Sequence, residues 1–156
     1  MSQYMKIKGI QGNVTTKGFE GCVELHHSNR TGNRLVRQQV GSGNREMGLL
    51  QLSHLEIQKS TDNASAELWQ HFYTGKSIPE LTITCCQLNN KNPEWHSKCT
   101  LSNVMVVSIY ETNNEGGTGE NIELAFSKIE QQFRSQSASG QWQTQKAVGF
   151  DIPTAK

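Results

Sequence analysis

The chain has 156 residues and a formal net charge of +1, with only 34% hydrophobic and 19% charged residues. The near-neutral charge gives no electrostatic basis for binding nucleic acid or a membrane surface, and no apolar run approaches the length of a membrane span. The length suits one domain, residues 1–156, and its Ser, Thr, Asn and Gln content fits a β-rich surface or a large subunit interface.

The N-terminal sequence MSQYMKIKGIQG lacks the apolar segment of a signal peptide. We therefore expect a protein that folds in a cytosol and does not leave by the general secretory route. This compartment predicts free thiols for all four cysteines: Cys22, Cys85, Cys86 and Cys99. Cys85 and Cys86 point to opposite faces of an expected strand, so they do not readily share a metal ion. The sequence thus predicts neither a metal site nor a cofactor.

The first part of the chain predicts short strands around a basic segment. Strands are expected at residues 4–10 and 21–27, with a turn-rich loop between them. Residues 28–48 are the most irregular segment, with a short strand at 35–40 and four arginines: Arg30, Arg34, Arg37 and Arg45. The segment is either a solvated loop or a basic arm that docks on a partner, and the sequence leaves both open.

Residues 55–88 predict a strand, the one convincing helix of the chain, and another strand. Asp62 and Asn63 are suitable N-cap residues, because their side-chain oxygens accept hydrogen bonds from the free amides of a first helical turn. Gly75 follows the last periodic residue, where a left-handed C-cap favours glycine. An apolar stripe over about three turns is formed by residues four apart: Ala64, Leu68 and Phe72.

Alternation predicts further strands on both sides of the helix. Residues 49–58 alternate with a slip that indicates a bulge near Ser53 or His54, and residues 80–88 form the strand after the helix. Residues 95–111 are the longest strand candidate and carry apolar side chains on both faces. One face has Leu101, Met105, Val107 and Ile109, and the other has Val104, Val106 and Tyr110. A strand covered on both faces packs in the barrel on one side and against the helix or another subunit on the other.

The last third predicts a hairpin and two more strands. Residues 113–119 (NNEGGTG) form the hairpin loop. The following strand changes phase between Phe126 and Ile129, which indicates a second bulge near residues 127–128. A turn at residues 136–141 precedes a last strand at 142–152. The chain is therefore expected to be mainly β, an antiparallel β-barrel or two-sheet sandwich of about eight strands with one α-helix on its side.

Motifs of the common enzyme classes do not occur. There is no HExxH, no GxSxG and no P-loop, and the glycines of residues 116–119 lack the helix and lysine that a phosphate loop needs. We therefore expect a protein that is not an enzyme. A small β-barrel hydrolase, with a site assembled from distant strands, is the less favoured alternative.

Five stretches, spread over nearly the whole chain, occur in an order typical of one family. They are MKIKGIQGNVTTKGFEGCVEL, IQKSTDNASAELWQHFYTGKSIPELTI, CTLSNVMVVSIYE, ENIELAFSKIEQQF and VGFDIPTAK. Together they resemble the Hcp (haemolysin-coregulated protein) family of type VI secretion systems. A phage-like tail-tube subunit shares the implied architecture and is the main alternative.

The resemblance implies a hexameric ring with a wide central hole. Rings stack into a tube inside a contractile sheath, and the tube, topped by a spike protein, is fired outward with effectors held and protected in its lumen. The implied partners are other copies of the chain, the spike, the sheath and effector proteins, and the implied route runs from the bacterial cytoplasm to the outside without a signal peptide. We expect the ring and stacking interface to involve Arg30, Arg34, Arg37, Arg45, Val104, Val106 and Tyr110.

Overall fold

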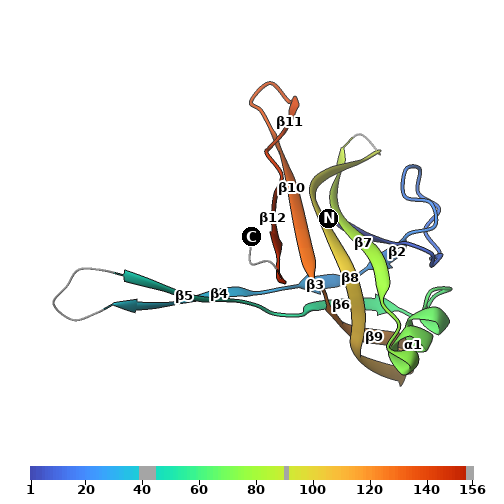
Figure 1. The fold of residues 1–156 in the computed structure, drawn as a ribbon. Coiled ribbons are helices and arrows are strands. Elements are labelled where there is room, and N and C mark those ends of the chain that lie inside the picture. Colours follow the sequence, from blue (N-terminus) through green and yellow to red (C-terminus); the bar gives the residue numbers. More distant parts are fainter. Residues whose placement is uncertain (39–44, 90–91, 154–156) are drawn as a thin grey trace.

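The computed structural model describes residues 1–38, 45–89 and 92–153, which form twelve strands and one helix, α1 (Ser65–Thr74) (Figure 1). The strands are β1 (Ser2–Ile7), β2 (Val23–Leu25), β3 (His27–Asn29), β4 (Gly32–Gln38), β5 (Arg45–Leu52), β6 (Leu55–Ser60), β7 (Ile78–Asn89), β8 (Asn92–Asn114), β9 (Gly117–Ala125), β10 (Lys128–Gln136), β11 (Trp142–Thr144) and β12 (Val148–Asp151). The mainly β, antiparallel class predicted from the sequence is confirmed. The strand number is higher because several expected strands are broken in two.

The main sheet curves round one core. Its order is β2-β1-β7-β8-β9-β6-β3, with β10 also on β8 and with β11 and β12 on β10. The two ends of this path, β2 and β3, are consecutive in the chain, and between them the amide of His26 donates to the carbonyl of Gln58 at 2.8 Å. The continuous chain therefore closes the sheet into a barrel-like body. Apolar side chains from β1, β2, β6, β7, β8 and β9 fill it.

Strand β8 is the longest of the described strands. Irregularities along it explain why apolar residues occur on both of its expected faces. Its first half pairs with β7 and β10, and its second half pairs with β9. Asn103 has a positive φ of 50°, and the register shifts between Val106 and Ser108. Each irregularity moves the alternation by one residue. The residues that face the core therefore change phase along the strand, without a second covered face.

Helix α1 packs against β8 and starts later than predicted. It begins at Ser65, with Ala64 in the N-cap position, whereas Asp62 and Asn63 lie in the preceding turn. Asp62 still accepts a hydrogen bond from the amide of Ala64 at 2.9 Å. The predicted C-cap is confirmed, since Gly75 has φ 70° and donates from its amide to the His71 carbonyl.

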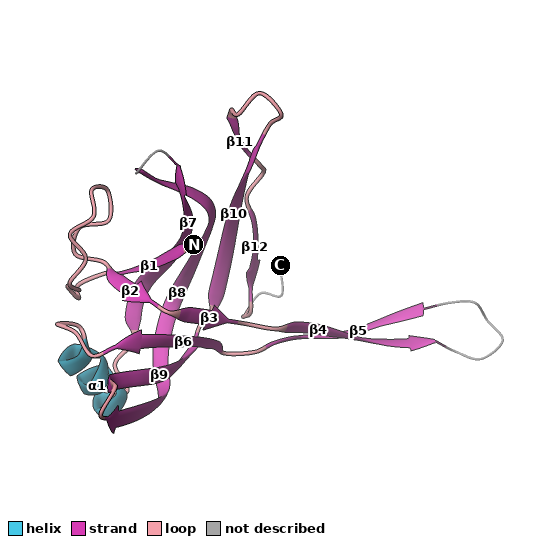
Figure 2. Ribbon diagram, turned by 180° about the vertical axis from the view of Figure 1, so that it is seen from behind, coloured by secondary structure: helices cyan, strands magenta, loops and turns pink. Residues whose placement is uncertain are grey.

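The basic segment is far more regular than expected. Strands β4 and β5 pair with each other over Gly32–Gln38 and Arg45–Leu52 and form a separate two-stranded sheet, here called the arm. The arm extends away from the body, on the opposite side from α1 (Figure 2). The expected bulge near Ser53 and His54 is a break between the arm and β6. An isolated two-stranded ribbon is marginally stable in water, so such an arm is suited to contact another molecule.

Three later expectations are also corrected. The expected bulge near residues 127–128 is a break between β9 and β10, where the amide of Ser127 donates to the Ser102 carbonyl. The expected last strand at 142–152 is two strands, β11 and β12, with residues 145–147 between them. The expected hairpin loop is shorter, because β8 reaches Asn114 and β9 starts at Gly117.

Candidate functional site

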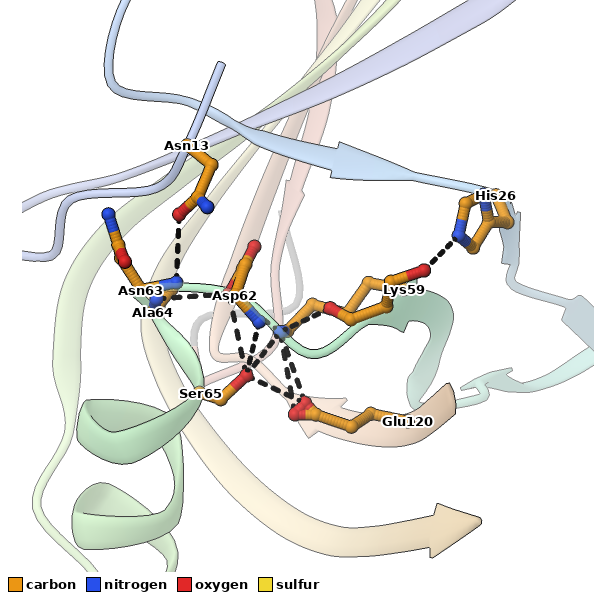
Figure 3. Close-up of polar contacts among 9 residues, drawn as sticks. Asn13, His26, Lys59, Asp62, Asn63, Ala64, Ser65 and Glu120 are labelled. Carbon is orange, nitrogen blue, oxygen red and sulfur yellow. Dashed lines mark hydrogen bonds and ion pairs between the residues drawn. The ribbon is translucent and has the colours of Figure 1, made fainter. Parts of the chain in front are cut away.

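A cluster of buried charges lies where β6 leads into α1 (Figure 3). The Lys59 side chain has no solvent exposure, and its Nζ lies 2.9 Å from Asp62 Oδ1 and 3.1 Å from Glu120 Oε2. The same Nζ donates to Ser65 Oγ at 2.9 Å and to the Ser60 carbonyl at 3.1 Å. Ser65 Oγ donates in turn to Glu120 Oε2 at 2.9 Å. Every polar group of the cluster thus has a partner within the chain.

The backbone explains how the cluster forms. Lys59 and Glu120 are directly opposite each other on the antiparallel strands β6 and β9, so their side chains meet on the core side of the sheet. Ser65 is the first residue of α1, and its Oγ also accepts from the amide of Asp62 at 3.0 Å. The cluster therefore ties the start of α1 to the end of two strands. Because the cluster is buried and its polar groups are paired with one another, its role is to anchor α1 to the sheet.

Sequence reasoning missed this cluster, although part of its signal was present. In β6 the inward side chains are Leu55, Ile57 and Lys59, so a lysine occupies a position where the alternation requires an apolar residue. A buried lysine needs a counter-charge. Its partner, Glu120, is 61 residues away, and only the strand register identifies it.

An exposed serine–histidine pair lies beside the cluster. His26 Nε2 and Ser60 Oγ are 2.8 Å apart, and both border a hollow of about 220 Å³ with Glu24 and Asp62. A catalytic serine needs a histidine that a third group orients. Among the residues that the structure describes, no hydrogen bond is made to the other ring nitrogen of His26. The pair therefore lacks the geometry of a triad.

Two of the four cysteines, Cys22 and Cys86, are buried, and Cys85 and Cys99 are half-buried. All four are free thiols, as predicted. Burial raises the pKa of Cys86 to about 11 and also raises the pKa values of Cys22 and Cys99. A thiol with a raised pKa is rarely a thiolate at neutral pH and is a poor nucleophile. These three thiols therefore give no support to the hydrolase alternative.

Residues 1–38, 45–89 and 92–153 offer neither a metal-binding cluster nor a helix that could cross a membrane. Within these ranges, no group of three or more His, Cys, Asp or Glu side chains is placed to hold a metal ion. The one helix that they contain is too short to cross a membrane.

The predicted interface arginines lie on the arm and at its base. Arg34 is exposed on β4, and its Nη1 donates to the Gly48 carbonyl of β5 at 3.3 Å. Arg30 precedes the arm. Its guanidinium donates to the side-chain oxygen of Gln131 on β10 when the Gln131 amide is turned so that its oxygen faces the arginine. The backbones of Arg37 and Arg45 belong to β4 and β5, but their side chains fall outside the described residues. The structure thus places Arg34 and the backbones of Arg37 and Arg45 on one projecting ribbon, and Arg30 at its base.

The other three predicted interface residues, Val104, Val106 and Tyr110, do not lie on one surface. Val104 and Val106 are 0% and 3% exposed and belong to the chain's own core. Neither side chain is therefore exposed to another subunit, because both face the core of the barrel. Tyr110 is 64% exposed on the outer face of the same strand and remains available to a partner.

Comparison with known proteins identifies a family. A family model described as "Type VI secretion system effector, Hcp" matches residues 4–133. No curated protein matches significantly.

Solved structures match along nearly their whole length. Hcp1 from Salmonella typhimurium is 22% identical with a TM-score of 0.79, covering 99% of this chain and 97% of that one. A structure described as a type six secretion system protein is 21% identical with a TM-score of 0.90, covering 99% and 98%. A type VI secretion system effector from Yersinia pestis is 18% identical with a TM-score of 0.71, covering 96% and 99%. At these identities the structures show a common fold.

Proposed function

This chain belongs to the Hcp family of type VI secretion system proteins, and we propose that it is a structural subunit of the secreted inner tube. The observation that carries this conclusion is the family match over residues 4–133, which spans the closed barrel, the arm and α1. The tube subunit works by assembly, so its activity is the formation of rings and stacks and requires no catalytic step or cofactor.

The finer proposal is that six copies form a ring and that rings stack into a tube that carries effectors in its lumen. A head-to-tail ring needs two different complementary surfaces on each chain. The projecting arm, with Arg34 exposed, and the outer face that carries Tyr110 support this arrangement. The proposed partners are other copies of the chain, and then the spike, sheath and effector proteins of the secretion system. The proposed route starts in the bacterial cytoplasm and needs no signal peptide.

Light scattering coupled to gel filtration tests the ring directly. The expected result is one species with six times the mass of a 17.4 kDa chain, and negative-stain electron microscopy of concentrated samples should show rings and tubes. A monomer at high micromolar concentration would overturn the tube assignment. Tubes that form without any other component of a secretion system would favour a phage-like tail tube instead.

A further inference from the structure

The Lys59 cluster holds an amine against two carboxyl groups and away from solvent (Figure 3). The side chains of Lys59 and Glu120 are 0% and 2% exposed, and that of Asp62, in the turn before α1, is 12% exposed. Nζ of Lys59 lies 2.9 Å from Asp62 Oδ1 and 3.1 Å from Glu120 Oε2. The groups that form an amide bond, and a further acid beside them, are therefore already in contact.

Burial favours a form of the cluster that has no net charge. One ammonium and two carboxylate groups carry a net charge of −1 when all three are ionised, and a buried charge without a counter-charge is costly. Two buried carboxyl groups beside one cation avoid this cost when they share a proton. The cluster then consists of an ammonium group, a carboxylate and a carboxylic acid, so both a base and an acid are in contact with Nζ.

Asp62 is the carboxyl group placed to react. Its Oδ1 accepts a hydrogen bond at 2.9 Å from the amide of Ala64, at the start of α1. This donor and the helix N-terminus stabilise the negative charge that develops on Oδ1 when the carboxyl carbon is attacked. Glu120 is held beside Nζ by Ser65, whose Oγ donates to Oε2 at 2.9 Å. Glu120 is therefore the group placed to exchange protons.

The fold favours a condensation that is unfavourable between separate molecules in water. Lys59 and Asp62 cannot diffuse apart, and well-oriented groups of this kind react at effective concentrations of about 10⁵–10⁸ M. The two residues are three apart in the chain, so a bond between them closes only a short loop. The buried position also keeps water from hydrolysing the product.

We propose that the folded chain forms an intramolecular amide bond between Lys59 and Asp62, with Glu120 as the catalytic residue. Nζ loses a proton to a carboxylate in contact with it, and its lone pair forms the bond to Cγ of Asp62. The bond from Cγ to one oxygen breaks, and this oxygen leaves as water with the two protons that Nζ has lost. Glu120 carries one proton before and after the reaction, and no oxidant, cofactor or other reactant is consumed.

The amide bond would make the attachment of α1 permanent. Freshly folded chains hold the ion pairs that the structure shows, and these are the reactants. After the reaction, a covalent bond that salt and denaturants do not break joins the end of β6 to the turn before α1. The reaction takes place within one chain and does not depend on the proposed assembly.

Intact-mass spectrometry of the folded, purified chain tests the reaction directly. The expected product is about 18 Da lighter than the calculated mass of the 17.4 kDa chain, because one water is lost. Trypsin should no longer cleave after Lys59, and fragmentation should locate the bond between Lys59 and Asp62. A chain that keeps its full mass after prolonged incubation in the folded state would overturn the inference. A bond to Glu120 instead would also overturn it.

Two variants identify the reacting groups. Asp62→Asn should lose ammonia in place of water, about 17 Da, because the leaving group is then nitrogen. Lys59→Arg keeps a positive charge but cannot form the same bond, so it should keep its full mass. A loss of water that persists in Lys59→Arg would mean that Asp62 has cyclised onto its own backbone, and the proposed bond would be wrong.

A third variant tests the role of Glu120. Glu120→Gln keeps the size of the side chain but removes the acid, so the bond should form about 10²–10⁴-fold more slowly. Glu80→Gln, at an exposed acid on β7, is the control and should react at the rate of the parent. Circular dichroism establishes that each variant is folded before its mass is followed. A folded Glu120→Gln that reacts as fast as the parent would contradict the catalytic role.

Discussion

Lys59 lies at a position of β6 that faces the core, and its charge is balanced only by groups inside the chain. Replacement by methionine keeps the length of the side chain but leaves Asp62 and Glu120 without their cation. Breaking a buried ion pair on one side costs about 3–5 kcal/mol. We therefore expect Lys59→Met to lower the free energy of unfolding by that amount in urea titrations.

Two matched variants separate burial from charge in this experiment. Lys76→Met, at an exposed lysine after α1, should change the free energy of unfolding by less than about 0.5 kcal/mol. Lys59→Met combined with Glu120→Leu should recover part of the loss, since no carboxylate then faces the lysine position. A single variant as stable as the parent would mean that the cluster does not anchor α1.

The pKa of the Cys86 thiol predicts how the stability of the folded chain depends on pH. Burial raises its pKa to about 11, from an ordinary value near 9.0. Between these values the unfolded chain loses the thiol proton and the folded chain keeps it, so the folded state binds more protons and stability falls as pH rises. The free energy of unfolding should therefore decrease from pH 9 to 11 in denaturant titrations. Cys86→Ala should show a shallower decrease, and an unchanged slope would contradict the assignment.

Helix α1 offers a sharp contrast between its inner and outer faces. Leu68 is 1% exposed and Tyr73 is 73% exposed. Leu68→Ala should cost about 2–5 kcal/mol of unfolding free energy, because it leaves a cavity against the barrel. Tyr73→Ala, measured in the same urea titrations, should cost far less. Equal effects would show that the apolar stripe is not what attaches the helix.

The arm predicts a variant that affects assembly without affecting the core. Gly48 on β5 lies opposite the register shift between Arg34 and Val36, and a β-carbon there would collide with the Leu35 carbonyl oxygen. Gly48→Ala should therefore distort the arm, lower the mass found by light scattering and leave the melting temperature almost unchanged. Gly32→Ala, whose β-carbon would meet only an ordinary contact with Leu52, is the control and should assemble normally.

Elements whose signal is local could be predicted from the sequence. The α1 stripe, the Gly75 C-cap and the hairpin turn after Asn114 all depend on neighbouring residues, and the structure has each of them. Features that depend on distant pairing could not be predicted. The inward turn of Val104 and Val106 follows from irregularities in β8 that only its partner strands reveal. The sequence of the arm predicts no regular strand pair, because strands without a core are under no pressure to alternate.

At the scale of the molecule, stability and assembly are assigned to different parts of the chain. The barrel and α1 hold the buried apolar residues and the Lys59 cluster. The arm contributes little to that core, and its Leu35 and Val36 are exposed. In the proposed assembly, this division would let changes on the arm alter contacts between copies without unfolding the body.

The arginines of the arm and its base give the clearest test of this division. Replacing Arg30, Arg34, Arg37 and Arg45 together by serine removes four positive charges from residues 30–48. Because the barrel does not depend on them for its core, the melting temperature should stay close to that of the parent. Tube formation, scored by electron microscopy and sedimentation, should be lost or require a much higher protein concentration.

The matched control replaces four exposed lysines outside the arm by serine: Lys8, Lys17, Lys76 and Lys128. This variant has the same change in net charge and should preserve the tubes. Unchanged tubes in the arginine variant would mean that the arm arginines do not join the copies. A large fall in melting temperature would mean that the arm and the body are not independent.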